Sequence, residues 1–345
     1  MPDDKLKVGI AGYGIVGKRR RSVIDMHPRL ETVAICDKVF SDCGTMADGV
    51  KYFQNYIQLL ELPLDILFVC LPNYLAPEAT ILGLEKGMHV FCEKPPGRTV
   101  HDVEKVIEVE KRNPHLCLKY GFNHRYHDSV QKALQLVQSG EFGEVINMRG
   151  VYGKSKIIPF SGGWRAERKY AGGGILLDQG IHLVDLMCLF VGEFIEIKSF
   201  VSNSFWKHDV EDNAYAIMRD RQGRVAMIHS SATQWQHRFS LDISLSKGFI
   251  VLRGILSGSK SYGEEELIVG KSEEAISGSS SEHVTKYLED NSWKSDVNEF
   301  ADAILNGKKI VHGSSADALT AMKIVYRIYW NDPEWREAYN IASPE

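Results

Sequence analysis

The chain has 345 residues, too many for one ordinary hydrophobic core, so its length predicts two domains. Its composition, 44% hydrophobic and 25% charged, is that of a soluble globular protein, and a net charge of −4 argues against a general nucleic-acid binder. No apolar run reaches the ~18 residues that span a bilayer, and the acidic start does not resemble a signal peptide. Six cysteines without a C-x-x-C pair favour buried thiols in a reducing cytoplasm over a metal site.

The first third of the chain alternates short apolar runs with helical segments. The runs predict strands buried on both faces, at 7–14, 32–37, 66–72, 89–95 and 116–122. The segments between them predict crossover helices at 16–27, 51–61, 77–87 and 100–112. This alternation predicts a doubly wound α/β domain over residues 1–123. The basic run Lys18–Arg21 on the first helix is expected to be a solvated face.

The remainder, residues 124–345, predicts a second domain of another kind. An amphipathic helix starts at about residue 127 and ends at Gly140, and a second helix covers 172–192. From 195 to 270, β-rich runs separated by turn signals predict an antiparallel meander. The polar loop 272–284 is expected to be mobile. Helices return at 295–307 and 314–330, and these are candidates to pack back on the first domain.

The first strand runs into a phosphate-loop pattern. Gly12, Gly14 and Gly17 have G-x-G-x-x-G spacing, with a strand before and a helix after. The glycines allow a tight turn, a close approach of backbone to a pyrophosphate, and close packing of helix on strand. The N-terminus of the helix offers free N–H groups to phosphate. The pattern therefore predicts a dinucleotide site formed by Gly12, Tyr13, Gly14, Ile15, Val16 and Gly17.

The second predicted strand ends at Asp37, 20 residues after Gly17. An acidic residue at this place hydrogen-bonds the ribose hydroxyls and repels a 2′-phosphate, which favours NAD. Lys38 follows directly and would tolerate a 2′-phosphate, so NADP remains an alternative.

A lysine follows another buried strand. Glu93, Lys94 and Pro95 lie just past the run HVFC, at the carboxyl edge of the sheet where open α/β folds bind ligands. A lysine in that place would lie near the nicotinamide of a bound dinucleotide.

The helix predicted at 172–192 carries an unusual polar stripe. In GGGILLDQGIHLVDL the polar residues Asp178, Gln179, His182 and Asp185 fall at helical spacing on one side, and the rest is apolar. A narrow solvated face would explain the pattern, and so would a catalytic face.

Several motifs together resemble one family. They are G-x-G-x-x-G at 12–17, Pro72-Asn73, Glu93-Lys94-Pro95, Trp164-Arg165, and the glycine-rich helix start at 172–185. In this order and spacing the chain resembles the Gfo/Idh/MocA family over nearly its whole length. The resemblance implies an N-terminal Rossmann domain and a C-terminal α/β domain with a large, open, mainly antiparallel sheet. It also implies that this sheet makes a homodimer or homotetramer.

The resemblance further implies an NAD(P)-dependent oxidoreductase that acts on a sugar, nucleotide sugar or cyclitol, oxidising a hydroxyl or reducing the matching ketone. The implied catalytic residues are Lys94, Asp178 and His182. The implied cofactor residues add Asp37, Lys38, Leu71, Pro72, Asn73, Glu93 and Lys94 to the phosphate loop. Leu71 and Ala76 depart from the family, many members of which have Thr and His there, so the contacts of that loop are left open.

Hydride transfer from a C–H bond requires a base for the hydroxyl proton, and His182 titrates nearest neutral pH. Asp178 could bind a neighbouring hydroxyl or orient the imidazole, and Lys94 could stabilise the alkoxide or relay the proton. Substrate candidates are Asn123, Arg125, Trp164 and Arg165, each of which could equally serve packing. Two other functions stay open: an NAD-dependent glycosidase that oxidises its substrate transiently, and a dinucleotide-binding regulator without catalysis.

Overall fold

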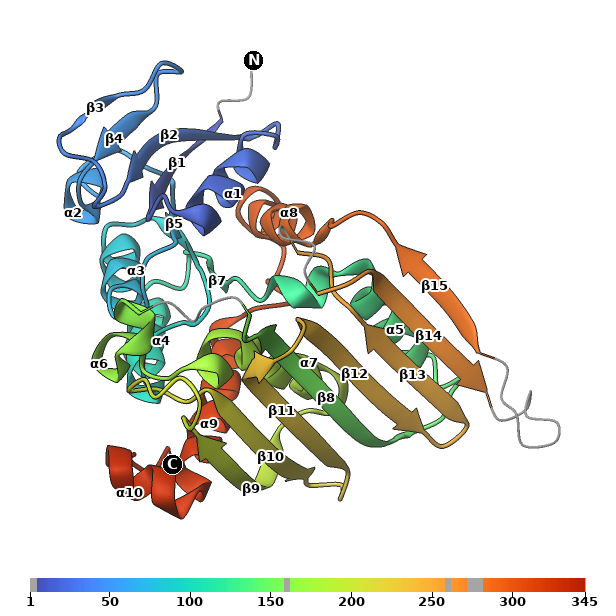
Figure 1. Cartoon of the computed structure of the whole chain (residues 1–345). Helices are drawn as coiled ribbons and strands as arrows, with labels where there is room; N and C mark the ends of the chain where they lie inside the picture. Colours follow the sequence, from blue (N-terminus) through green and yellow to red (C-terminus); the bar gives the residue numbers. More distant parts are fainter. Residues whose placement is uncertain (1–4, 158–161, 258–261, 272–281, 345) are drawn as a thin grey trace. The chain divides into compact units, whose positions relative to one another are not determined.

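The computed structural model describes residues 5–157, 162–257, 262–271 and 282–344, so most of the loop predicted to be mobile lies outside the described residues. The chain divides into two compact units (Figure 1). Unit 1 comprises Met1–Phe122 and Trp293–Leu319, and unit 2 comprises Asn123–Ser292 and Thr320–Glu345.

Unit 1 is a Rossmann-type domain with a seven-stranded sheet in the order β3-β4-β2-β1-β5-β6-β7. Its strands are β1 Leu6–Ala11, β2 Leu30–Cys36, β3 Gly44–Thr45, β4 Lys51–Phe53, β5 Ile66–Val69, β6 His89–Cys92 and β7 Leu118–Tyr120. All neighbouring pairs are parallel except β3 with β4. Its helices are α1 Ile15–Ile24, α2 Tyr56–Leu59, α3 Ala76–Glu85, α4 Val100–Arg112 and α8 Ser292–Asn306. The predicted doubly wound fold is confirmed.

One predicted helix of this unit is wrong. Residues 51–61 form the strand β4 followed by the short helix α2. Tyr52 pairs in parallel with Ile35 of β2, because aromatic residues suit an extended, half-buried position. Asn55 then starts α2, and its side chain accepts a hydrogen bond from the backbone N–H of Gln58.

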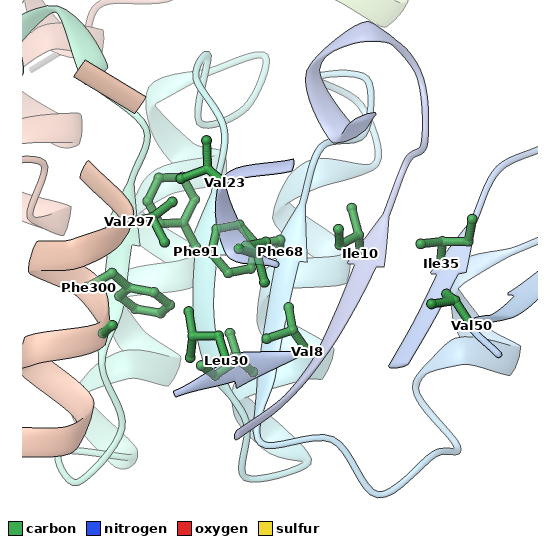
Figure 2. Packing of buried hydrophobic residues seen from close by; sticks show 13 residues of the cluster. Val8, Ile10, Val23, Leu30, Ile35, Val50, Phe68, Phe91, Val297 and Phe300 are labelled. Carbon is green, nitrogen blue, oxygen red and sulfur yellow. The ribbon is translucent and has the colours of Figure 1, made fainter. Parts of the chain in front are cut away.

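Aromatic rings join α8 to the sheet in the core of unit 1 (Figure 2). Phe68 of β5 and Phe91 of β6 stack with their centroids 4.8 Å apart. Phe300 of α8 meets both rings edge-on, at 5.9 and 5.5 Å. Such pairs favour offset or edge-to-face geometry, so α8 is an integral part of this core although it lies some 170 residues later in the chain than the rest.

Unit 2 is built on an eight-stranded sheet in the order β15-β14-β13-β12-β8-β11-β10-β9. Its strands are β8 Val145–Ser155, β9 Phe194–Ser202, β10 Asn213–Asp220, β11 Val225–Gln234, β12 Arg238–Leu245, β13 Gly248–Arg253, β14 Glu265–Lys271 and β15 His283–Tyr287. Neighbours are antiparallel except β8 with β11, so the mainly antiparallel sheet is confirmed.

The predicted meander is interrupted by a strand that the sequence pattern did not reveal. β8 lies between β11 and β12, pairing in parallel with the first and antiparallel with the second. Gly150 lies in its middle and hides the β pattern, since glycine usually weakens a strand. A Cβ at Gly150 would come within 2.8 Å of side-chain atoms of Leu183 and Met187, which explains the glycine.

Helices cover one face of this sheet (Figure 1): α7 packs against β8 and β11, and α5 against β13 and β14. The helical elements of unit 2 are η1 Asn123–Tyr126, α5 Asp128–Gln138, η2 Trp164–Ala166, α6 Arg168–Ala171, η3 Leu176–Gly180, α7 Ile181–Val191, α10 Pro333–Tyr339 and most of α9 Ser315–Asn331, whose residues up to Leu319 belong to unit 1. The helix predicted at 172–192 is therefore a π-helical turn, η3, that leads into α7. Arg168–Val191 is apolar and long enough to span a membrane by composition, but 72% of its most apolar window is buried in the fold, as in a core helix.

Candidate functional site

The phosphate loop of unit 1 has the backbone geometry that its glycines predict. Gly12 has a φ of 93°, and a Cβ there would lie 2.3 Å from the carbonyl oxygen of Cys70. A Cβ on Gly17 would lie 2.0 Å from the carbonyl oxygen of Gly12, whereas a Cβ on Gly14 meets no atom within 4 Å. The open position at Gly14 and the N-terminus of α1, which no side chain caps, leave backbone N–H groups available to a pyrophosphate. The loop therefore fits a dinucleotide.

Asp37 lies at the carboxyl end of β2, next to this loop. Its Oδ2 accepts a hydrogen bond from the backbone N–H of Tyr13 at 2.8 Å, and its Oδ1 accepts one from Val39 at 3.2 Å. These bonds fix the carboxylate beside the G-x-G turn, where it suits ribose hydroxyls. Lys38 is exposed.

At the end of β6, a buried ion pair holds the residue that precedes Lys94. Glu93 is buried, and its Oε1 accepts from Arg20 Nε at 2.6 Å. Lys94 is half-buried and joins Pro95 through a cis peptide bond. Leu71 and Pro72 are half-buried after β5, Asn73 is buried, and Ala76 begins α3.

Arg20 corrects the expectation of a solvated face at Lys18–Arg21. Its side chain is fully buried, and its guanidinium lies 4.3 Å from the ring centroid of Phe91 and 4.4 Å from that of Trp293. Its Nη2 donates to Asp296 Oδ2 at 2.8 Å. Burial by itself lowers the pKa of Arg20, but Glu93 and Asp296 outweigh it and raise that pKa.

In unit 2, Asp178 and two of the predicted substrate residues come together. Asp178 lies in η3 with 29% of its side chain exposed, and Arg165 Nε lies 3.9 Å from its Oδ1. The Arg165 guanidinium in turn lies 4.3 Å from the ring centroid of Trp164. A carboxylate, a guanidinium and an aromatic face are the groups that bind polyhydroxylated molecules.

His182, one turn further along, is only 3% exposed and lies against another histidine. Its ring stacks on that of His124 with centroids 3.7 Å apart and planes at 11°. The Nε2 of His124 lies 3.1 Å from the hydroxyl of Tyr152. Burial, with smaller contributions from Tyr262 and Asp178, raises the pKa of Tyr152 well above its usual value, so this phenol stays protonated. No sequence motif indicated that His124 stacks on His182 or that Tyr152 of β8 lies beside it.

The other two predicted substrate residues are buried in unit 2. Arg125 forms a bidentate ion pair with Asp185, with Nε–Oδ2 and Nη2–Oδ1 distances of 2.8 and 2.6 Å. Asn123 donates from Nδ2 to the Ser292 hydroxyl at 3.0 Å. Of the polar stripe, Asp185 thus binds an arginine, and Gln179 accepts a hydrogen bond from the hydroxyl of Tyr262 at 2.9 Å.

Glu211 fixes the glycine segment that leads into η3. Its carboxylate accepts hydrogen bonds from the backbone N–H groups of Gly174 and Leu176, at 2.7 and 2.9 Å, and from the Tyr329 hydroxyl at 2.7 Å. A Cβ on Gly174 would lie 2.1 Å from the Glu211 carbonyl oxygen, so this glycine permits the close approach. Burial raises the pKa of Glu211 although Tyr329 and Arg168 oppose it.

A phosphate loop on a Rossmann domain, joined in one chain to a carboxylate and an imidazole on a largely buried helix, defines a dinucleotide-dependent oxidoreductase. Within the described ranges, no cluster of three or more His, Cys, Asp or Glu residues could hold a metal ion. Residues 6–121 match the oxidoreductase family with an NAD-binding Rossmann fold, and residues 130–251 match the GFO/IDH/MocA C-terminal domain. The chain belongs to the Gfo/Idh/MocA family of oxidoreductases.

Known members of the family resemble this chain in sequence and in fold. D-glucoside 3-dehydrogenase of Escherichia coli is 28% identical over 257 residues, which cover 67% of this chain and 71% of that protein. Inositol 2-dehydrogenase of Salmonella paratyphi B is 25% identical over 194 residues, covering 54% of this chain and 55% of that protein. The solved structure of a levoglucosan dehydrogenase in complex with NADH shares the fold, with a TM-score of 0.84 at 20% identity over 96% of this chain and 98% of that one.

Proposed function

We propose that the protein is an NAD-preferring dehydrogenase or ketoreductase of a sugar, nucleotide sugar or cyclitol. The observation that carries the proposal is the position of Asp178 one turn before a nearly buried His182, in a chain whose phosphate loop is bonded to Asp37 at the end of β2. The named activities of its relatives, on a glucoside and on inositol, support this substrate class. The acidic Asp37 supports NAD over NADP, since a 2′-phosphate would be repelled.

The proposed mechanism assigns a chemical task to each candidate residue. When bound, NAD supplies the hydride acceptor at nicotinamide C4. His182 removes the proton of the reacting hydroxyl, Asp178 binds a neighbouring hydroxyl or holds the imidazole, and Lys94 stabilises the alkoxide. In the direction of ketone reduction, the same groups return the proton.

We assign cofactor binding to residues 1–123 and substrate binding to residues 124–345, apart from Trp293–Leu319, which belong to unit 1. Trp164 and Arg165 are the proposed substrate contacts, because they adjoin Asp178 and Arg165 is 53% exposed. Asn123 and Arg125 are proposed to support the substrate site without touching the substrate, since both are buried and hydrogen-bonded. We place the enzyme in the cytoplasm, a setting that suits its six free cysteines.

The proposal is tested by a screen of polyols, aldoses, glycosides and nucleotide sugars with NAD and NADP in parallel, following the absorbance of reduced cofactor. We expect turnover with NAD on one of these classes and its loss in a Lys94→Ala, His182→Ala double variant. The exposed residues Lys105 and His101 provide the matched control, Lys105→Ala with His101→Ala, which keeps full activity.

Three results would redirect the assignment. Normal turnover in the double variant would remove both residues from the mechanism. Cleavage of a glycoside without net formation of NADH would favour a glycosidase that oxidises its substrate transiently. Dinucleotide binding without turnover on any of these compounds would favour a regulator.

We further propose that unit 2 makes a homodimer or homotetramer through the open face of its sheet. Phe200, Tyr215, Ile217 and Met227 project from β9, β10 and β11 and are 79, 48, 54 and 43% exposed. Phe200 lies opposite Tyr215 and Ile217 opposite Met227, so the four form one apolar patch. A contiguous exposed patch of this kind marks an interaction surface.

Sedimentation velocity tests this assembly. Ile217→Lys should shift the protein towards monomer, whereas Arg219→Lys, two residues along on the same face, should leave the assembly unchanged. A wild-type protein that sediments as a monomer at micromolar concentration would refute the proposal.

A further inference from the structure

The ring of His124 stacks on that of the candidate base, His182, and His124 has no role in the proposed mechanism. Its ring covers that of His182 at a centroid distance of 3.7 Å and an interplanar angle of 11°, and both side chains are at least nine-tenths buried. The titratable groups next to His124 are Tyr152 from β8 and His127 at the start of α5, and Tyr262 and Asp178 lie close enough to Tyr152 to raise its pKa. His127 is bound to Glu265 through Nδ1 at 2.7 Å.

A chain of hydrogen bonds sets the proton position on His124. The Ser292 hydroxyl donates to Asp290 at 2.6 Å, and it accepts from Asn123 Nδ2 at 3.0 Å. The Asn123 oxygen therefore faces His124 Nδ1, at 3.4 Å, and an amide oxygen only accepts. With the proton on Nδ1, Nε2 accepts from the Tyr152 hydroxyl at 3.1 Å. Every contact in this chain suits a neutral imidazole.

We propose that His124 is a positioning residue for His182, a neutral flat ring that supports the imidazole while it takes the proton of the substrate. Two cationic rings face to face would repel, so a neutral His124 leaves His182 as the ring that becomes charged. The cation formed on His182 would then lie over the π face of His124, an attraction that exists only after proton transfer. This inference rests on the proposed dehydrogenase function.

Two substitutions of His124, each with an apolar side chain large enough to fill its space, distinguish the contribution of a flat ring from that of filled volume. His124→Phe keeps a flat π face, and His124→Leu does not. We expect kcat of the Leu variant to fall about 3- to 30-fold below that of the Phe variant, with KM for substrate and affinity for NADH little changed. Phe239→Leu is the control, because Phe239 is a buried ring that meets His124 edge-on at 6.0 Å and has no contact with His182 among the ring pairs of the described residues.

The pH profile and the tautomer give two independent measurements. If His124 is neutral throughout, the acidic limb of kcat/KM stays in place in the Phe variant. In ¹⁵N-labelled histidine spectra, wild-type His124, assigned by its absence in the Phe variant, should show the Nδ1–H tautomer, and Tyr152→Phe should shift its Nε2 signal. Equal kcat in the Phe and Leu variants, a displaced acidic limb, or a charged or Nε2–H His124 would each overturn the inference. The spectra need no substrate, so they test the neutral Nδ1–H state of His124 separately from the proposed dehydrogenase function.

Discussion

Glu211→Ala tests whether one buried carboxylate holds the start of the candidate catalytic helix. The substitution removes the acceptor for three buried donors, the N–H groups of Gly174 and Leu176 and the hydroxyl of Tyr329. Each unpaired buried donor costs about 1–3 kcal/mol. Since burial of the Glu211 charge is itself unfavourable, as its raised pKa indicates, part of this loss is offset. We expect the free energy of unfolding to fall by about 3–5 kcal/mol.

Urea denaturation followed by tryptophan fluorescence measures this change, with two companion variants. Glu211→Gln keeps one acceptor oxygen and should lose about 1–2 kcal/mol. Glu264→Ala, at an acid with 64% of its side chain exposed, should change stability by less than about 1 kcal/mol. The reasoning is refuted if the Glu211→Ala and Glu264→Ala variants have the same free energy of unfolding, or if Glu211→Gln is as unstable as Glu211→Ala.

Three further predictions follow from the same structure. Gly14→Ala should leave stability unchanged but weaken NAD binding at least about 10-fold, whereas Gly17→Ala, whose Cβ would lie 2.0 Å from a carbonyl oxygen, should also lower the melting temperature. Arg20→Met should cost about 3–5 kcal/mol in chemical denaturation, because it removes the cation that pairs with buried Glu93 and leaves Asp296 with Lys119 alone, and the exposed neighbour Lys18→Met should cost almost nothing. Burial, aided by the charge of a nearby arginine, lowers the pKa of His229 from 6.5 to about 4. Between those pH values the unfolded chain binds the extra proton, so acid destabilises the fold, and His229→Gln should reduce the fall in melting temperature over that range.

Each of these predictions has an outcome that contradicts it. Unchanged NAD affinity in Gly14→Ala would mean that the loop does not approach a phosphate. Equal stability of the Arg20→Met and Lys18→Met variants would show that the ion pairs of Arg20 do not stabilise the fold. His115→Gln, at an exposed histidine, is the control for the pH experiment, and a change in its profile as large as that of His229→Gln would refute the assignment.

The parts of the fold that local pattern determines could be predicted from the sequence. The phosphate loop and Asp37 lie within 26 residues of each other, and their spacing alone indicates the strand, turn and helix that hold them. The contacts that support the candidate site could not be predicted. Arg20 finds Glu93 and Asp296 at separations of 73 and 276 residues, and a basic run by itself indicates only a surface. Likewise, His124 stacks on His182 only because the tertiary fold of unit 2 brings these distant residues together, and no local spacing pattern indicates that contact.

The π-helical turn η3 makes the direction of Asp178 a matter of chain length. A π turn holds more residues than an α turn, and each residue of an α-helix advances by ~100°. Removing one residue from Leu176–Gly180 would let the turn relax to α geometry. Because a residue of an α-helix turns through a larger angle than a residue of a π turn, four residues would then cover nearly the same angle as the five do, and the flanking segments would keep their directions. The side chains within the turn, Asp178 among them, would change direction. The number of residues in 176–180 therefore sets where the Asp178 carboxylate points, while the segments on either side do not depend on it.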